Sequence, residues 1–406
     1  MNYTQSEVEQ FVVEEDVKFI RIAFVDIFGK MKNISIMPSE LARAFDYGVS
    51  IDASAISGFG GDVRSDILLH PDASTISFLP WRPERGRVVR MFCSITNPDG
   101  SPFEADTRSI LMKAVAASNE ESVSFAFGSE MEFYLFQRDE RGTPTKQPFD
   151  SAGYMDVSPE DKGENVRREI CLTLERMGIT PESSHHEEGP GQNEVDFRYS
   201  DPLTAADAAI TFRFVVNTIA AMNGLCADFS PLPLAGYPGN GMHINVSAKK
   251  TDQNDVMNYV LAGLLKHAYE STLFFNPTEA SYRRFGVNKA PKYISWSREN
   301  RSNLLRVPAA VGEFRRLELR SPDPTCNPYL AYALMIYAGL DGIRKGESPA
   351  APLDVNLHNE LNASALNLQM LPRDLSEACS AARTSAFIAK IIPAGLLDCY
   401  LKLGGN

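Results

Sequence analysis

FGSEMEFYL, residues 127–135, alternates apolar and ionisable residues with a period of two. Successive side chains of a β-strand point to opposite faces of the sheet, so this stretch predicts a strand with Glu130 and Glu132 on one face and apolar side chains on the other. Three further stretches follow the same period: NEVDFRY (193–199), MHINVS (242–247) and RLELR (316–320). A sheet face that gathers carboxylates, a histidine and arginines is unfavourable unless cations and anions bind there. The pattern therefore predicts a site where divalent metals bridge a polyphosphate.

The composition is that of a globular protein with a substantial core. The chain has 406 residues, of which 44% are hydrophobic and 23% charged, enough for one large domain or two of ordinary size. The net charge of -12 argues against nucleic acid or an anionic membrane surface as the main partner. No basic segment followed by an apolar run opens the sequence, and no apolar stretch of about 18 residues occurs in it. We therefore expect a cytoplasmic protein that does not bind a membrane.

Turn-forming residues divide the chain at NPDGSP, residues 97–102. Before this point, alternating stretches at 17–26 and 32–37 flank a turn and predict a hairpin in a small sheet domain. Beyond it, short strands alternate with predicted helices at 106–117, 162–177, 203–222, 255–274, 327–344 and 375–391. Helices interleaved with strands that each present one polar face predict an α+β fold with a curved sheet or barrel and a concave site.

Each motif has an ordinary explanation when it stands alone. Alternating acids are common on exposed strand faces. The stretch HHEEGPGQNE, residues 185–194, is also typical of a solvated loop, and a single histidine such as His243 is more often structural than functional. Five arginines within 20 residues, Arg301, Arg306, Arg315, Arg316 and Arg320, are equally compatible with a solvated basic face. Only their combination favours a functional site.

Taken together, these segments resemble the signature blocks of glutamine synthetases, in the family's order. The matching blocks are GSEMEF (128–133), HHEEGPGQNEVDF (185–197), GNGMHINVS (239–247), NRSNLLRVP (300–308) and RRLELRSPDPTCNPYLAYALMIYAGLDGI (315–343). The resemblance implies a small β-grasp-like N-terminal domain, residues 1–100. It also implies a large catalytic domain, residues 101–406, with a curved antiparallel sheet or partial barrel flanked by helices. The implied activity is an ATP-dependent ligation of glutamate to an amine through γ-glutamyl phosphate.

The resemblance also implies a metal site with two or three ions. By similarity, one ion near glutamate would be held by Glu132, Glu187 and Glu194. A second ion, bound to ATP, would be held by Glu130, His243 and Glu318. Carboxylate oxygens with one imidazole suit Mg²⁺ or Mn²⁺.

The remaining residues are assigned by the same resemblance to the nucleotide, to glutamate and to the amine. Those expected at the nucleotide or its phosphates are Glu182, Asn245, Ser247, Arg301, Arg306 and Arg316. Those expected to hold glutamate or the phosphoryl group are Gly239, Arg284, Arg301 and Arg320. The catalytic residues would be Asp52, Lys289, Arg306 and Arg320. Asp52 would enter the ammonium pocket of a neighbouring subunit, which implies a homo-oligomer, a hexameric ring or a dodecamer, with sites between subunits.

Two positions in the matching region depart from the family pattern. Lys289 stands where the family carries the glutamate of its flap, and Pro238 stands where an asparagine is usual. One charge contact at about 4 Å and an effective dielectric constant near 20 is worth roughly 4 kcal/mol, so reversing the flap charge is enough to disable an ammonium site. In addition, Gln369 replaces the tyrosine that some bacterial members adenylylate, so we expect no such control.

These departures leave three hypotheses. The first is a glutamate–amine ligase that uses ammonia poorly. The second is a non-catalytic relative kept as a structural or regulatory oligomer, which the complete metal set disfavours. The third is a ligase for a different acid, or for an anionic amine that pairs with Lys289.

Overall fold

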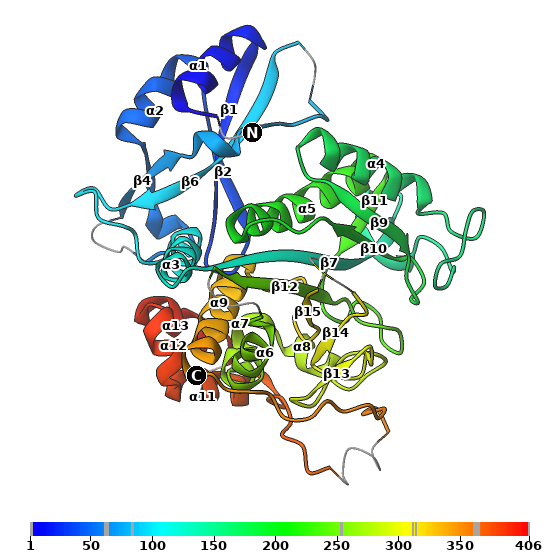
Figure 1. The fold of residues 1–406 in the computed structure, drawn as a ribbon. Coiled ribbons are helices and arrows are strands. Elements are labelled where there is room, and N and C mark those ends of the chain that lie inside the picture. Colours follow the sequence, from blue (N-terminus) through cyan, green and yellow to red (C-terminus); the bar gives the residue numbers. More distant parts are fainter. Residues whose placement is uncertain are drawn as a thin grey trace.

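The N-terminal part of the chain is a six-stranded sheet accompanied by helices α1 (Gln5–Glu14) and α2 (Leu41–Tyr47) (Figure 1). The structure, a computed structural model, describes residues 3–60, 65–82, 85–251, 255–310, 312, 315–359 and 366–404. The strands are β1 (Val17–Val25), β2 (Met31–Ile36), β3 (Val49–Asp52), β4 (Asp66–Pro71), β5 (Ser77–Phe78) and β6 (Arg87–Thr96). Their order is β2-β1-β6-β4-β3, with β5 paired to β6. The predicted hairpin is confirmed by the antiparallel pair β1 and β2.

A nine-stranded sheet forms the centre of the larger part (Figure 1). Its strands are β7 (Val123–Arg138), β8 (Pro144–Pro148), β9 (Pro181–His186), β10 (Gln192–Phe197), β11 (Leu225–Asp228), β12 (Met242–Lys250), β13 (Trp296–Arg298), β14 (Leu305–Val307) and β15 (Leu317–Leu319). The order is β13-β14-β15-β12-β7-β10-β9, and β8 and β11 also pair with β7. All pairs are antiparallel except β13 with β14. The four polar stretches lie on β10, β7, β12 and β15, which are adjacent in this order.

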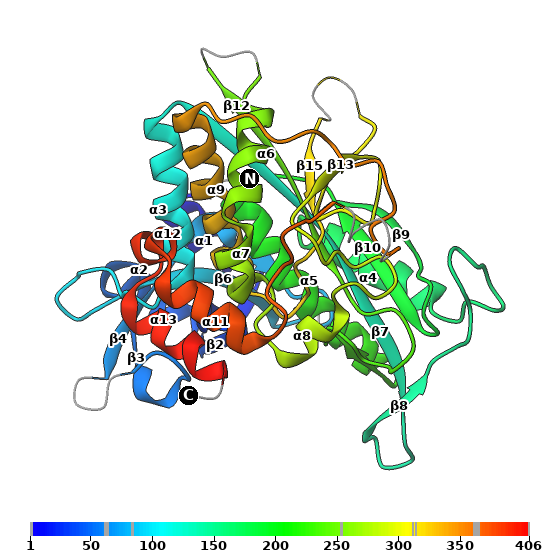
Figure 2. The ribbon, with the colours of Figure 1, turned by 90° about the horizontal axis from the view of Figure 1, so that it is seen from below.

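Helices cover the apolar side of this sheet and one of its ends. They are α3 (Thr107–Glu120), α4 (Glu164–Arg176), α5 (Pro202–Met222), α6 (Met257–Lys266), α7 (Ala268–Phe275), α8 (Glu279–Arg284), α9 (Pro328–Lys345), α11 (Leu375–Thr384), α12 (Ala386–Ile391) and α13 (Ala394–Leu401). Helix α5 packs on β7 and β11, and the ring of Phe133 on β7 meets that of Phe212 on α5 edge to face, with 6.1 Å between centroids. Figure 2 shows α6, α7 and α9 grouped near the other end, where α9 also contacts α3. The predicted α+β class is confirmed, whereas the domain boundary at residue 100 stays a prediction.

The prediction of two of the long helices as continuous was wrong. The helix expected at 255–274 is broken between α6 and α7 at His267, whose ring is hydrogen-bonded to Glu270 and to Asp341, each at 2.9 Å. The helix expected at 375–391 is broken at Ser385, which has an extended backbone and accepts the N–H of Ile388 as the N-cap of α12. In both places a side chain that binds the backbone or a neighbouring helix overrides the apolar periodicity.

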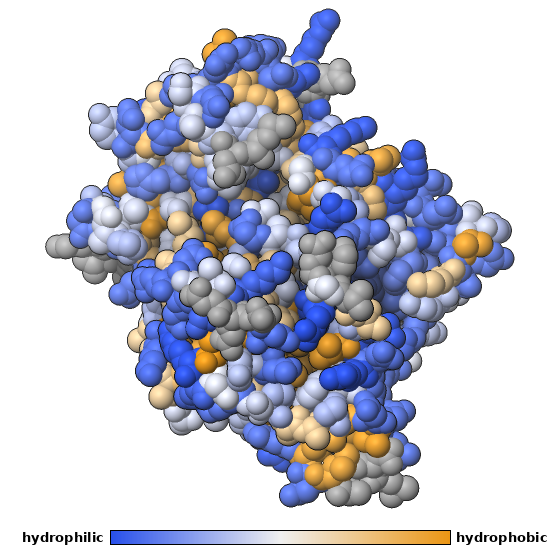
Figure 3. Space-filling view, in the orientation of Figure 1, coloured by the Kyte–Doolittle hydropathy of each residue, from blue (hydrophilic) through white to orange (hydrophobic). Residues whose placement is uncertain are grey.

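Helix α5 is the one helix among the described residues that is long and apolar enough to cross a membrane by length and composition. Of its most apolar window, 67% is buried within the protein. The helix also carries Asp207 and Arg213, whose side chains bind Arg108 and the carbonyl of Pro324. This burial and these contacts identify α5 as a core helix. Figure 3 shows a mostly hydrophilic face with small, scattered hydrophobic patches.

A buried ion-pair network connects the two parts of the chain. Arg108 on α3 binds Asp72, which follows β4, at 2.8 Å and Asp207 on α5 at 3.0 Å. Asp207 also accepts the hydroxyl of Tyr329 on α9 at 2.6 Å. Since Arg108 is buried and both partners are mostly buried, the network holds the N-terminal sheet against α5 and α9.

Arg108→Met should lower the free energy of unfolding by about 3 kcal/mol, because it leaves two mostly buried carboxylates without their shared cation. The measurement is chemical denaturation followed by circular dichroism. The matched control is Arg43→Met, which removes an ion pair with Glu40 that is largely exposed on both sides and should change stability by less than about 1 kcal/mol. Equal effects of the two variants would contradict a role for the network in stability.

Candidate active site

A row of ionisable side chains crosses the nine-stranded sheet. Glu130 on β7 lies directly opposite Asp196 on β10 and His243 on β12. Glu318 on β15 lies directly opposite Arg306 on β14. Directly opposite residues project from the same face of a sheet, so the four strands bring their polar residues together as their period of two predicts.

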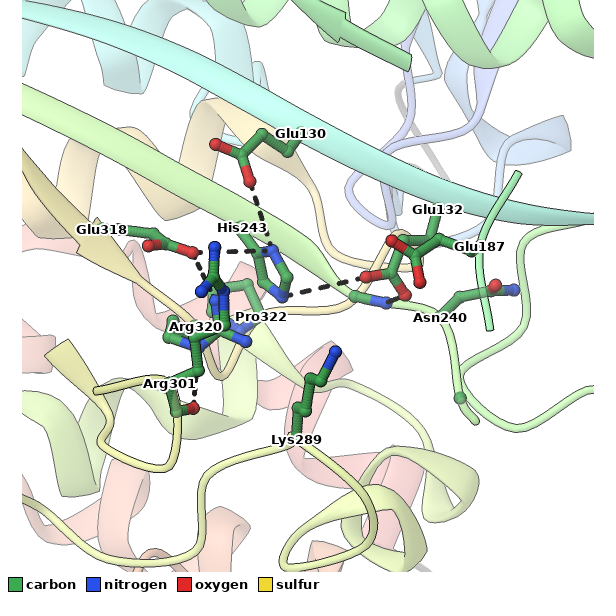
Figure 4. A network of polar contacts seen from close by, with 12 residues as sticks. Glu130, Glu132, Glu187, Asn240, His243, Lys289, Arg301, Glu318, Arg320 and Pro322 are labelled. Carbon is green, nitrogen blue, oxygen red and sulfur yellow. Dashed lines mark hydrogen bonds and ion pairs between the residues drawn. The ribbon is translucent and has the colours of Figure 1, made fainter. Parts of the chain in front are cut away.

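These side chains line one cavity, into which Lys289 also points (Figure 4). Its acidic lining residues are Glu130, Glu132, Glu187, Glu188, Glu194, Asp196 and Glu318. Its basic lining residues are Arg284, Lys289, Arg301, Arg306 and Arg320. All six predicted metal ligands are therefore in the same cavity. The described lining has more acidic than basic groups, which favours binding of a cation there.

Glu130, His243 and Glu318 form the first group of possible metal ligands, with one ligand atom of each lying within 4.8 Å of the others. His243 Nδ1 is 3.4 Å from Glu130 and 3.7 Å from Glu318 (Figure 4). Burial disfavours the charge on Glu130, but hydrogen bonds from His243 and Asn245 outweigh it and lower the pKa of Glu130 to about 2. A carboxylate that stays ionised beside an imidazole is ready to bind a metal.

Glu318 is held between two arginines from neighbouring strands. It is fully buried, accepts a hydrogen bond from Arg306 Nε, and accepts another from Arg320 Nη1 at 2.5 Å. Arg320 also donates Nε to the carbonyl of Arg301 at 3.1 Å. Arg306, predicted at the phosphates, and Arg320, predicted to hold glutamate or the phosphoryl group, are thus directed to the same carboxylate, whereas Arg316, also predicted at the phosphates, lines the adjoining pocket.

A histidine and several carboxylates form the second group of possible metal ligands. His185, Glu187 and Glu194 have ligand atoms within 4.8 Å of one another, and Glu194 is also grouped with Glu130 and Asp196. Burial, together with the charges of the surrounding carboxylates, raises the pKa of Glu194 well above its ordinary value. Asp196 Oδ1 and His185 Nδ1 are buried without a hydrogen-bond partner among the described residues.

The ligand set predicted for the ion near glutamate, Glu132, Glu187 and Glu194, stays a prediction. Glu187 and Glu194 fall in one ligand group with His185, whereas Glu132 accepts the N–H of Gly241 at 2.8 Å and lies 4.0 Å from His243. Glu132 is therefore near both groups without belonging to either. The unpaired, buried Asp196 Oδ1 and the carboxylates around it form an oxygen-rich set that fits a hard divalent ion such as Mg²⁺ or Mn²⁺.

A second pocket adjoins the first and is more apolar. It contains four of the six residues expected at the nucleotide, namely Glu182, Asn245, Ser247 and Arg316. Glu130 lines both pockets. Asn245 accepts Arg316 Nε at 3.0 Å and donates to Glu130 at 2.7 Å, which joins the two spaces.

Three further residues predicted at the site lie in different surroundings. Gly239 lines the cavity, and a Cβ there would lie 2.3 Å from the carbonyl of Pro231, so only glycine fits. Arg284 is buried and donates to the carbonyls of Ser321 and Pro322 at 2.8 and 3.2 Å, so its role toward glutamate stays a prediction. Asp52 lies on β3, is exposed, and is not among the described residues that line the cavity of its own chain.

Sequence reasoning did not identify two contacts of Lys289. Its ammonium group pairs with Glu188 and lies 5.3 Å from the ring centroid of Tyr154. Glu188 lies in the loop between β9 and β10, and the sequence of this loop is typical of a solvated, charged loop. Nothing in the sequence singles out Tyr154. Gln192, which donates to Glu132 at 3.2 Å, was also missed, although it lies inside a matching block.

Comparison with known proteins finds relatives along the whole chain. The family models described as "Glutamine synthetase, beta-Grasp domain" and "Glutamine synthetase, catalytic domain" match residues 16–98 and 104–404. The glutamine synthetase of Methanosarcina mazei is 42% identical over 98% of this chain and 92% of that protein. The glutamine synthetase of Clostridium saccharobutylicum is 43% identical over 93% of this chain and 88% of that protein.

Two solved structures have the same fold. The structure described as "GmaS/ADP complex" is 28% identical, has a TM-score of 0.89, and covers 100% of this chain and 95% of its own. The glutamine synthetase of Plasmodium falciparum, determined by electron cryomicroscopy, is 22% identical, has a TM-score of 0.88, and covers 99% of this chain and 95% of its own. At that identity the second likeness concerns the fold alone.

Glu194→Gln should stabilise the metal-free protein at pH 7.5 by about 1–3 kcal/mol, the usual cost of an unsatisfied buried polar group. Because folding raises the pKa of Glu194, this carboxyl group lowers the stability of the native state as the pH rises above its unfolded value near 4.5. The advantage of the variant should therefore shrink as the pH falls toward that value. Thermal denaturation in a chelator measures it.

Added Mn²⁺ should reverse the order, because the original chain loses its unfavourable charge on binding while the variant loses a ligand. Glu182→Gln is the control, since it leaves both ligand groups intact and removes only a long, exposed contact of 3.8 Å with Arg198. A metal-free Glu194→Gln protein that is less stable than the original at pH 7.5 would contradict this account of the cavity.

Proposed function

The chain belongs to the glutamine synthetase family, and on that premise we propose that it joins glutamate to an amine through γ-glutamyl phosphate and uses ammonia poorly. Family membership makes it a ligase that forms C–N bonds. The observation that carries the finer proposal is the convergence of Glu130, His243 and Glu318 with Arg306 and Arg320 in one cavity. This cavity adjoins the pocket that collects the predicted nucleotide residues.

The family uses ATP and divalent metals, and the residues of this chain fit both. We assign one Mg²⁺ or Mn²⁺ to Glu130, His243 and Glu318, and a second to Glu187 and Glu194 with Glu132 nearby. When bound, such ions neutralise the phosphates and orient them. The nucleotide would occupy the adjoining pocket, and the relative solved with ADP supports this assignment.

The two arginines on Glu318 can serve the phosphoryl group. An anionic phosphoryl group next to Glu318 would attract Arg306 and Arg320 away from their shared carboxylate, which is then free for the metal. Planar guanidinium groups stabilise the charge that spreads over the transferring phosphoryl oxygens. Arg301 lines the same cavity and is assigned to the glutamate substrate.

The two chemical steps balance without any further reactant. The γ-carboxylate oxygen of glutamate attacks the terminal phosphorus of ATP, and ADP leaves. The amine nitrogen then attacks the acyl carbon, the C–N bond forms, and the C–O bond to phosphate breaks with its electron pair leaving on phosphate. An amine that enters as ammonium gives up two protons in all, one before it attacks and one as the amide forms; the leaving phosphate takes one of them and solvent takes the other.

The flap region favours poor use of ammonia. Lys289 lines the cavity on the side opposite the sheet, where its positive charge repels ammonium (Figure 4). Its ion pair with Glu188 also engages a nearby carboxylate that would otherwise attract a cation. The same ion pair also favours the alternative, a non-catalytic oligomer, because it ties the flap segment of Lys289 to the loop between β9 and β10.

An oligomer is part of the proposal. Asp52 is exposed on the N-terminal sheet and outside the cavity of its own chain, so it would reach such a cavity only in a neighbouring subunit. We therefore propose a homo-oligomer with sites between subunits, as a hexameric ring or a dodecamer.

With Mg-ATP and glutamate, the protein should release phosphate in response to at least one amine in a panel of primary amines. Glu318→Ala should lower this rate by about 100-fold or more, the range seen when one group that stabilises the transition state is removed. Glu347→Ala, which breaks an exposed ion pair with Lys266, is the matched control and should keep the original rate. Absence of amine-dependent phosphate release with every acceptor would favour the non-catalytic alternative.

Lys289→Glu should raise ammonia-dependent phosphate release by about tenfold or more, since it replaces a repulsive contact worth up to roughly 4 kcal/mol by an attractive one. Steady-state rates over a range of ammonium concentrations measure the change. Lys292→Glu is the control, because Lys292 is exposed in the same segment and is not among the described residues that line the cavity. An unchanged rate for Lys289→Glu would mean that the flap charge does not limit the use of ammonia.

A further inference from the structure

Lys289 and Glu188, which form an ion pair, both line the cavity of the candidate active site. Lys289 follows α8 in a segment of two tight turns, in which Gly286 N–H donates to the carbonyl of Ala290 and Ala290 N–H donates to that of Val287, each at 3.1 Å. These turns fix the backbone that carries the lysine. Its side chain is 53% exposed and that of Glu188 is 36% exposed, so solvent or a ligand can reach both members of the pair.

A second, more open cavity begins at Lys289, and its described lining has three cationic side chains against two acidic ones. Arg298, Arg301 and His358 line it, together with the acids Glu299 and Asp354. Asp354 accepts the hydroxyl of Ser297 at 2.5 Å. Among the described residues, neither Arg298 nor Arg301 has an ion-pair partner, and His358 Nε2 is buried without a hydrogen bond. The space that continues from Lys289 thus offers several unused donors to an anion.

We propose, on the basis of the function proposed above, that the acceptor is an amine that also carries a carboxylate, that is, a free amino acid. Lys289 binds the carboxylate of this acceptor, and Glu188 binds its ammonium group before attack. The product is then a γ-glutamyl amino acid. Arg298 adds positive charge on the side where the carboxylate lies.

The charges of the pair make an amino acid a better ligand than a simple amine. A zwitterion gives Lys289 a carboxylate and Glu188 an ammonium group as new partners. Each side chain therefore replaces its present partner, and no charge is left unpaired. A simple amine provides a partner for Glu188 alone and leaves Lys289 next to a cation. A simple carboxylic acid has no nucleophile. Specificity therefore arises from a repulsive element as well as an attractive one.

The experiment compares amino acids with the amines that lack only their carboxylate. The pairs are glycine with methylamine, β-alanine with ethylamine, and γ-aminobutyrate with propylamine. The full chain is incubated with Mg-ATP, glutamate and each acceptor, phosphate release is followed, and the product is identified by mass spectrometry. At least one amino acid should exceed its paired amine at least tenfold in kcat/KM, with a γ-glutamyl product of the expected mass.

Variants test which residue provides the preference. Lys289→Met should lower the ratio of kcat/KM for the preferred amino acid to kcat/KM for the paired amine at least tenfold, mainly by raising KM for the amino acid. The far-ultraviolet circular dichroism spectrum and the melting temperature show whether the variant is folded. Lys292→Met, an exposed lysine outside the described lining of both cavities, is the matched control and should keep the preference. Arg298→Met should weaken the preference in the same direction, and by less.

The outcomes separate this inference from the proposed function. Phosphate release that is as fast with every simple amine as with its paired amino acid overturns the inference and leaves the ligase function standing. A preference for amino acids that survives in Lys289→Met overturns the role of Lys289. No phosphate release with any acceptor overturns the ligase proposal itself.

Discussion

The structure depends on the repulsion between carboxylates that one sheet gathers into a single cavity. Glu130, Glu194 and Asp196 have oxygens within 4.8 Å of one another, and Glu194 is almost fully buried. Such a cluster is tolerable only where cations approach it, from arginines of the same sheet or from bound metal. Because Arg306 lies on β14 and Arg320 directly follows β15, the sheet and its end supply part of the compensating charge. The arginines do not balance all of the carboxylate charge, and the remaining negative charge is of the kind that divalent ions neutralise.

The fold keeps this cluster in place by giving the sheet two unlike faces. Phe133, next to Glu132 on β7, packs on Phe212 of α5, so the apolar face is anchored by an entirely different helix from those near the cavity. A slip of one residue in β7 would move its carboxylates into that apolar contact, which makes the register strongly determined. The network around Arg108 then ties α5 to the N-terminal sheet. The geometry of the cavity is therefore coupled to the stability of the whole chain.

Much of this could be predicted from the sequence because a period of two reports directly on which residues share a sheet face. The pairing of Glu130 with His243 and the hairpin of β1 and β2 follow from that rule. What could not be predicted depends on contacts between segments with no shared period. The break at His267 arises from Asp341, 74 residues away, and the partner of Lys289 lies 101 residues away in a loop. The resemblance identified Lys289 as a departure from the family pattern, but only the fold shows that its ion-pair partner is Glu188.

The positions of the unusual residues indicate that the cavity has two parts that vary separately. Most of the groups assigned to metals and phosphate lie on strands, where register holds them; Glu187, in the loop between β9 and β10, and Arg320, just after β15, are exceptions. Lys289 and Glu188 lie instead on a turn and a loop, which accept charge changes with little effect on the sheet. An isolated lysine in the flap would leave an unpaired positive charge beside the arginines, whereas the pair of Lys289 with Glu188 has no net charge of its own. A reversal of sign that is locally compensated alters which acceptor can bind while it preserves the residues for phosphoryl transfer, and this is the arrangement expected of a change in specificity.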